Sequence, residues 1–90
     1  MNKFRRNSIY YVETLLKEIE ENTVDIRQRI EDVRDEEEEY LENMPESLVS
    51  SAKGEAANEA IEALDDAVAV LQSAEADIAV ALELLETARA

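Results

Sequence analysis

The sequence predicts an all-α fold in which two long helices form one antiparallel αα-hairpin that resembles a coiled coil. Its 90 residues include one glycine, one proline, and no cysteine or histidine, and helix-favouring residues dominate the rest. Apolar residues recur at alternating spacings of three and four. The only proline, Pro45, divides the chain into two similar halves. We therefore predict that residues 1–90 form a single helical-hairpin domain.

The first helix is expected over residues 8–42. Oppositely charged residues four apart, such as Asp25 and Arg29, support it. Polar residues interrupt its apolar seam only at Thr23 and Glu37. The seam consists of Ile9, Val12, Leu16, Ile19, Thr23, Ile26, Ile30, Val33, Glu37, Tyr40 and Met44.

A short turn is expected over residues 43–46. Pro45 ends the first helix because it has no amide hydrogen and disfavours a helical conformation at Met44. Proline also suits the first turn of a following helix, and Asn43 and Glu46 have the spacing of a capping pair.

The second helix is expected over residues 47–87, with a possible kink at 50–54, where Ser50, Ser51 and Gly54 weaken the helix. Two heptad rows carry its larger side chains, and a third row is entirely alanine. The rows are Ile61, Val68, Glu75 and Leu82; Leu64, Leu71, Ile78 and Leu85; and Ala60, Ala67, Ala74, Ala81 and Ala88.

Folding back about Pro45 predicts a register in which facing residue numbers sum to about 90. Val12 would then lie opposite Ile78, and Glu37 opposite Lys53. Larger residues of the first helix would alternate with alanines of the second.

Two helices leave apolar surface uncovered, which predicts self-association. A homodimer that closes a four-helix bundle would cover it, whereas the alternative is a different protein as the partner. The predicted oligomer interface consists of Tyr11, Leu15, Ile61, Val68 and Leu82.

The net charge of -14 lies entirely in residues 35–90. Such a charge disfavours binding to nucleic acid and to anionic membranes, and favours a basic or nucleic-acid-binding protein as the partner. The basic first residues lack the apolar stretch of a signal peptide, and no apolar run is long enough to span a membrane. We expect a cytoplasmic location.

The residue types argue against catalysis, because thiol and imidazole groups are absent. Two acid pairs, Glu36 with Glu39 and Glu62 with Asp65, resemble the magnesium-binding pattern of all-α nucleoside-triphosphate pyrophosphatases related to MazG. Few basic residues lie near them to hold a triphosphate. We therefore expect no enzyme activity, no cofactor and no specific metal site.

The amino-terminal residues are both basic and aromatic, a combination that suits a nucleotide or a cyclic dinucleotide. Alternatively, Arg5 and Arg6 pair with Glu83 and Glu86. The possible ligand contacts are Arg5, Arg6, Tyr10 and Tyr11.

Carboxylates crowd the end of the first helix, where they oppose the helix dipole. Because they do not favour the helix there, we interpret them as a protein-binding acidic tip. A purely solvated face and loose metal binding are the alternatives. The acidic tip consists of Asp35, Glu36, Glu38, Glu39, Glu42 and Glu46.

The stretch EEEYLENMPESLVSSAKGEAANEAIEAL resembles small acidic helical proteins common in bacteriophages and prophages, with residues 43–46 as its distinctive part. The resemblance, together with the acidic surface, suggests a phage-encoded inhibitor of a host nucleic-acid-binding or defence protein, of the anti-CRISPR or DNA-mimic type. The expected function is a noncatalytic acidic protein-interaction module. The alternatives are an oligomer that sequesters a nucleotide signal and a structural or assembly module.

Overall fold

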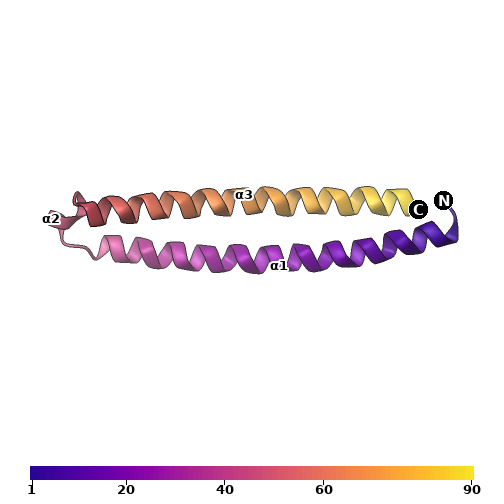
Figure 1. Ribbon diagram of the computed structural model, residues 1–90, viewed down its shortest axis with the longest axis horizontal. Helices are drawn as coiled ribbons and strands as arrows, with labels where there is room; N and C mark the ends of the chain where they lie inside the picture. Colours follow the sequence, from indigo (N-terminus) through magenta and orange to yellow (C-terminus); the bar gives the residue numbers. More distant parts are fainter.

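The computed structural model describes all 90 residues and shows an elongated antiparallel hairpin. Helix α1 (Lys3–Glu42) packs against α3 (Ala52–Arg89), and the short α2 (Glu46–Val49) lies at the turn. Both termini lie at the opposite end (Figure 1). The Cα atoms span 69 × 14 × 13 Å, with a radius of gyration of 20.1 Å. The predicted all-α hairpin is confirmed.

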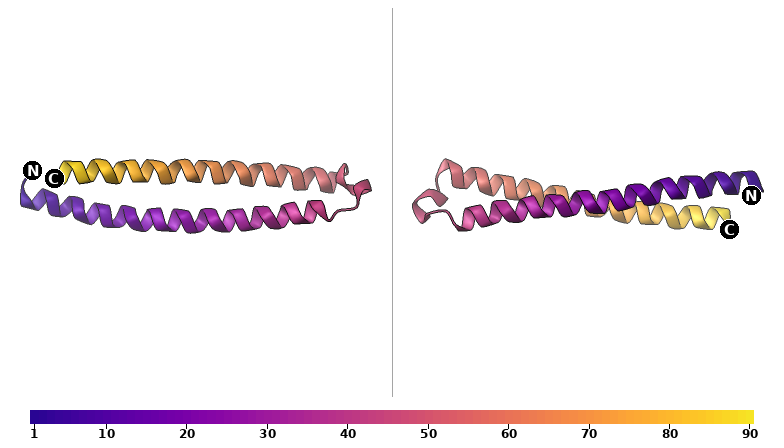
Figure 2. Two further views of the ribbon diagram at one scale, coloured as in Figure 1. Left: turned by 180° about the vertical axis from the view of Figure 1, so that it is seen from behind. Right: turned by 90° about the horizontal axis from the view of Figure 1, so that it is seen from below.

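The two long helices wind slightly around each other, as expected for a coiled coil. In the view from below in Figure 2, α1 and α3 cross near the middle of the hairpin. Each long helix therefore presents a similar strip of residues to its neighbour along most of its length.

Helix α1 ends at Glu42 as predicted but begins before the predicted residue 8. Its first turn is stabilised by Asn2, whose side-chain oxygen accepts a hydrogen bond from the Arg5 amide at 2.8 Å. Asn43 closes the other end by donating its backbone N–H to the Glu39 carbonyl at 3.0 Å. Asn43 is thus the C-cap of α1, and the predicted capping pair with Glu46 does not form.

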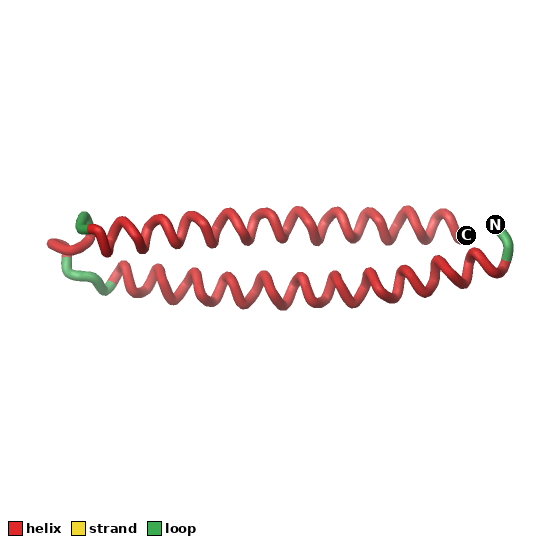
Figure 3. The backbone as a smooth tube through the Cα atoms, viewed as in Figure 1, coloured by secondary structure: helices red, strands yellow, loops and turns green.

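The predicted second helix is divided into α2 and α3 by a break at Ser50 and Ser51, within the segment where a kink was expected. Figure 3 shows this break as a loop beside the turn. Gly54 is buried there, and a Cβ at this position would lie 1.8 Å from the Val49 carbonyl oxygen. Only glycine permits so close an approach between two backbone segments.

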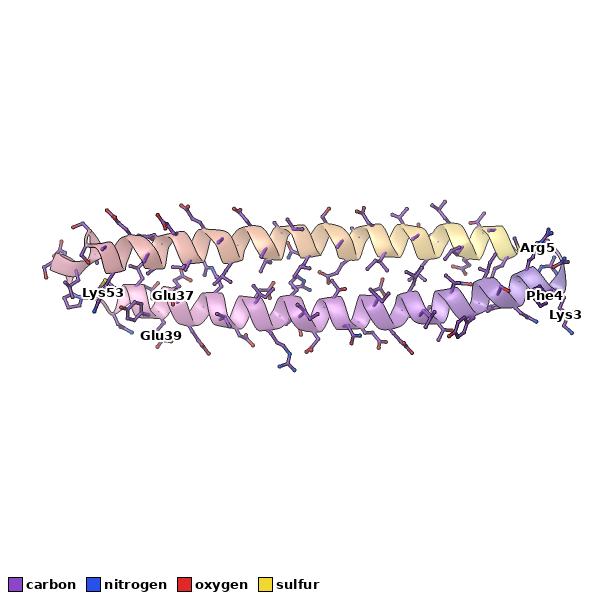
Figure 4. The ribbon with its side chains drawn as sticks, in the orientation of Figure 1. Lys3, Phe4, Arg5, Glu37, Glu39 and Lys53 are labelled. Carbon is purple, nitrogen blue, oxygen red and sulfur yellow. The ribbon has the colours of Figure 1, made fainter.

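The register between the long helices differs from the predicted one. Arg27 pairs with Glu75 and Arg34 with Asp65, whereas the predicted register would put residues 63 and 56 opposite these arginines. The difference arises at the turn, because α2 and the break after it take up residues that were assigned to the long second helix. Glu37 and Lys53 make no ion pair, although both lie near the turn (Figure 4).

The strip of α1 that faces α3 also differs from the predicted seam. One predicted row, from Ile9 to Met44, is half-buried as expected. The other, from Val12 to Tyr40, is exposed, and charged residues take its place between the helices. The half-buried or buried residues of this replacement row are Glu13, Glu20, Arg27, Arg34 and Leu41.

The hairpin has almost no apolar core of its own. Only Glu13, Gly54 and Ala57 are buried in the whole chain. Both heptad rows of larger residues on α3 are half-buried against α1, but no large apolar side chain is fully enclosed. Two helices cannot surround a side chain, so much apolar surface stays in contact with water.

Candidate protein-binding surfaces

Arg27 ties the middle of the two helices together. Its Nε donates to Glu75 at 2.6 Å across the hairpin, and its Nη1 donates to Glu31 at 2.8 Å within α1. The hydrogen bonds to Glu75 and Glu31 raise the pKa of Arg27 above its usual value, so the guanidinium stays charged. The side chains of Arg27 and Glu75 are only 18% and 16% exposed, which makes this a part-buried ion pair between the helices.

Arg89 closes the end of the hairpin that holds the termini. Its Nε donates to the Glu13 carboxylate at 2.7 Å, and its Nη1 donates to the Tyr10 hydroxyl at 3.1 Å. The guanidinium carbon also lies 4.3 Å from the centroid of the Tyr10 ring, the geometry of a cation–π contact. The hydrogen bond to Glu13 is the main reason that the pKa of Arg89 is raised.

Arg34 connects the two helices near the turn. Its Nε donates to Asp65 of α3 at 2.8 Å, and its Nη1 donates to Asp35 at 3.3 Å and to Glu38. The hydrogen bond to Asp65 is the main reason that the pKa of Arg34 is raised. Arg34 therefore joins α1 to α3 through Asp65 and also pairs with two carboxylates of the acidic tip. We call the surface formed by Glu13, Arg27, Arg34, Asp65, Glu75 and Arg89 the ion-paired face.

The opposite flank of the hairpin is apolar. Because Arg34 reaches Asp65, the flank of α1 with the arginines adjoins the flank of α3 with Asp65. The remaining flanks, marked by Val12 on α1 and Ala60 on α3, therefore lie together on the other side. We call this surface the apolar face. It consists of Val12, Ile19, Ile26, Val33, Tyr40, Ala60, Ala67, Ala74 and Ala81.

The structure divides the predicted acidic tip into three groups. Asp35 and Glu38 pair with Arg34. Glu36 and Glu39 line a pocket. Glu42 and Glu46 are exposed and form no ion pair. Arg34 is the only cation that forms an ion pair with any acid of the tip, so most of this charge is not neutralised.

The one pocket of the molecule has a volume of about 460 Å³ and lies at the turn. Its apolar surface comes from residues such as Tyr40, Met44 and Leu48, and Glu36 and Glu39 supply negative charge. The complete lining is Glu36, Glu39, Tyr40, Asn43, Met44, Pro45, Leu48 and Lys53. Because Tyr40 also ends the Val12 row, the pocket continues the apolar face. This pocket could not be predicted from the sequence, because it depends on how the turn, α2 and the start of α3 are arranged at the end of α1.

The predicted oligomer interface is split between two environments. Tyr11 and Leu15 are exposed, Tyr11 to 66%. Ile61, Val68 and Leu82 are half-buried on the strip of α3 that faces α1. These three residues therefore contribute to the hairpin itself, and the five residues do not form one exposed stripe.

The amino-terminal residues do not form the predicted contacts with α3. Arg5 and Arg6 make no ion pair, and Glu83 and Glu86 are not their partners. Figure 4 shows Lys3, Phe4 and Arg5 at the far end from the turn, and Phe4 is 80% exposed. Tyr10 instead contacts Arg89, as described above, and Tyr11 is exposed. The structure has no pocket at this end.

The acid pairs that were considered for magnesium are not gathered into one site. No group of three or more acidic residues is arranged to hold a metal ion, and Asp65 pairs with Arg34. Neither long helix has an apolar segment of the length and hydropathy needed to cross a membrane.

Comparison with known proteins identified no relative of this chain: no family model, no curated protein and no solved structure matches it.

Proposed function

We propose that the protein is a noncatalytic interaction module that binds a basic surface of another protein through its acidic tip. The observation that carries this proposal is the lack of charge compensation at the turn. Seven carboxylates occur between Asp35 and Glu46, and Arg34 is the only cation paired with any of them.

The arrangement of these carboxylates supports the proposal. Residues 35–39 are consecutive, and successive side chains of a helix point about 100° apart, so negative charge surrounds the end of α1. The charge also opposes the helix dipole, so helix stability does not account for it. A concentrated exposed charge of one sign accelerates association with a surface of the other sign.

Proteins that bind nucleic acids present basic surfaces of this kind, which makes them one class of partner. An inhibitor of a defence protein, encoded by a phage, is a special case of the proposal, and only the resemblance stated above supports that case. The nucleotide-sequestering alternative gains no support from the amino-terminal end, where the tyrosines line no pocket.

We also propose that the protein acts as a homodimer. The support is the apolar face, because its α1 row is about half exposed in a hairpin that fully buries only one apolar side chain, that of Ala57. Exposed apolar surface of this extent is unusual for a monomeric protein and typical of an interface.

A tip variant tests the acidic surface. Replacing Asp35 by Asn, and Glu42 and Glu46 by Gln, removes three charges that do not line the pocket. Binding of a fluorescent Arg/Lys-rich peptide should weaken about tenfold, as expected for up to three exposed ion pairs of about 0.2–1 kcal/mol each. Fluorescence anisotropy at low and physiological ionic strength measures the affinity, which should fall as salt rises.

The matched control removes the same net charge far from the turn. Glu18, Glu21 and Glu83 are exposed and unpaired, and their replacement by Gln should change the affinity less than twofold. Equal losses in both variants would show that only the total charge matters. An affinity that does not depend on salt would contradict the proposed mechanism directly.

A further inference from the structure

The apolar face is a continuous strip rather than a set of scattered residues. Val12, Ile19, Ile26 and Val33 follow one another at intervals of seven and are 43–53% exposed. Single exposed apolar residues are normal on a protein surface. A β-branched side chain every two turns along one flank indicates a surface that is shielded from water by another molecule.

We propose that a second copy of the chain covers this face in an antiparallel orientation, with the turn of each copy beside the amino-terminal end of the other. The inference rests on the proposed homodimer and adds to it the interface, the orientation and the register.

The size of the face is sufficient for a stable dimer. The hairpin is 69 Å long and 14 Å wide at the level of its Cα atoms. A face of these dimensions has an area on the order of 1,000 Å², compared with about 800 Å² per partner in an interface of standard size. Two copies packed face to face would close a four-helix bundle, the usual way in which helical hairpins enclose their apolar residues.

Charge determines the orientation. Lys3, Arg5 and Arg6 lie at one end of the hairpin without ion pairs, and the acidic tip lies at the other. A parallel dimer would bring two acidic tips together and two basic ends together. The antiparallel dimer instead places each basic end beside an acidic tip, which is the complementary arrangement.

The heptad spacing then fixes the register. Arg5 precedes Val12 by seven residues and belongs to the same row, whose centre lies between Ile19 and Ile26. A two-fold axis at that centre brings Ile19 of one copy to Ile26 of the second copy, and Val12 to Val33 of the second copy. It also brings Arg5 to Tyr40 of the second copy.

This register gives the pocket an occupant. Glu36, Glu39 and Lys53 line it together with Tyr40, so the pocket has a net charge of -1 beside the apolar surface of Met44, Pro45 and Leu48. An arginine suits such a site, because its aliphatic stem packs on apolar surface while its guanidinium bonds carboxylates and stacks on an aromatic ring. The Arg5 side chain of the second copy would supply this group at each end of the dimer.

The alanine row agrees with the same arrangement. With the two-fold axis perpendicular to the helices, α1 lies over α1 of the second copy and α3 over α3 of the second copy. The pairs of Arg27 with Glu75 and of Glu13 with Arg89 put the axis close to Ile78 of α3, so Ala74 and Ala81 lie beside it and let the two α3 helices approach closely, while the larger residues pack between the two α1 helices. Asp35 and Glu42 lie on another flank of α1 and stay open to the basic partner.

Disulfide trapping tests the orientation. In Val12→Cys/Val33→Cys, the two positions of one chain are 21 residues apart on one helix, about 30 Å, so no disulfide forms within a chain. We expect mild oxidation to convert this variant to a covalent dimer on a non-reducing gel. The single variants Val12→Cys and Val33→Cys should remain largely uncrosslinked. In this register position 12 does not lie opposite position 12 of the second copy, and position 33 does not lie opposite position 33.

Light scattering of the unmodified protein separates the two proposals. A monomeric mass would overturn the homodimer and the inference together. A dimeric mass without crosslinking of the double-cysteine variant would overturn the antiparallel register alone.

A charge reversal tests the pocket contact. Arg5→Glu should raise the dimer dissociation constant about fivefold, the effect of losing two exposed ion pairs of about 0.5 kcal/mol, one at each end of the dimer. Adding Glu36→Arg and Glu39→Arg to that variant should restore dimerisation. No restoration in a variant that remains helical by circular dichroism would overturn the proposed place of Arg5.

Discussion

The two faces of the hairpin use their residues in opposite ways. On the ion-paired face, Arg27, Arg34 and Arg89 reach across to carboxylates, so charged groups join the two helices of one chain. On the apolar face, the side chains of the row from Val12 to Val33 are only partly covered by α3 and stay about half exposed. Charged residues therefore take part in closing the hairpin beside the half-buried apolar rows, while the Val12 row stays uncovered.

This difference separates two tasks that one apolar seam often performs alone. Directional ion pairs fix which residues of α1 and α3 meet, since an arginine bonded to the wrong turn would leave a carboxylate unpaired. Apolar burial is less directional and remains free for association between chains. The comparison predicts that the apolar face contributes most of the stability and the ion-paired face most of the register.

The largest effect is expected from polar substitution of the apolar face. Ile19→Gln/Ile26→Gln should lower the free energy of unfolding by about 1.5–3 kcal/mol per chain, because full burial of each isoleucine is worth about 1.5–3 kcal/mol and half of each is already covered within the hairpin. Urea unfolding followed by circular dichroism measures this loss. The transition of the unmodified protein should also shift with protein concentration.

Val80 provides the matched control for that variant. Its exposure of 52% equals that of the two isoleucines within one percentage point, but it lies on the outer side of α3, away from both faces. Val80→Gln should change stability by less than about 0.5 kcal/mol. Equal effects at Val80 and at the isoleucines would mean that nothing covers the apolar face.

An intermediate effect is expected at the turn, which determines which residues fall on each face. Gly54→Ala should cost about 1–3 kcal/mol, because the new methyl group meets the backbone of Val49, which cannot move without shifting α2. The gain in helix propensity, about 1 kcal/mol, does not offset this. Thermal unfolding measures the loss, and Asn58→Ala, at an exposed position of α3 outside the pocket, is the control. A Gly54→Ala variant as stable as the parent would show that α2 does not pack as described.

The smallest effect is expected on the ion-paired face. Arg27→Gln leaves the Glu75 carboxylate without its cation at a site that is largely screened from water, so the melting temperature should fall, by less than for Gly54→Ala. Arg27→Met/Glu75→Leu should recover the loss, because an apolar pair of similar size avoids the cost of desolvating two charges. A double variant as unstable as the single one would show that the ion pair itself, and not the orphaned charge, matters.

The hairpin was predictable because its signals are local. Pro45 predicts the end of α1 independently of the rest of the chain. The heptad spacing can be recognised from the sequence of a single helix. The break at Ser50 and Ser51 falls within the segment that Gly54 had marked as weak. Such features depend on neighbours within a few residues.

The register and the faces were not predictable for a physical reason. Apolar spacing shows which residues avoid water but not which helix covers them, so the Val12 row was assigned to the neighbouring helix of the same chain. The charged row that includes Glu13 and Arg27 has the composition of a solvent-exposed flank. It lies between the helices instead of the Val12 row, because its long side chains find oppositely charged partners on α3. Neither the partner nor the length of α2 is visible from one helix alone.

The same limit applies to the binding surfaces. The acidic tip could be located from composition, because a run of carboxylates stays exposed in almost any fold. The pocket could not, since Tyr40, Met44 and Leu48 come together only through the arrangement of the turn and α2 at the end of α1. Lys53 also lies there without pairing with Glu37, because a salt bridge depends on a register that differs from the expected one.

The elongated shape of the hairpin affects how the molecule moves through solution. A globular chain of 90 residues would have a radius of gyration of about 12 Å, whereas this one has 20.1 Å. A rod of this kind experiences more friction than a sphere of equal mass and tumbles slowly about its short axes. Its elution volume in gel filtration would therefore correspond to a much heavier globular protein, even when only a single chain is present.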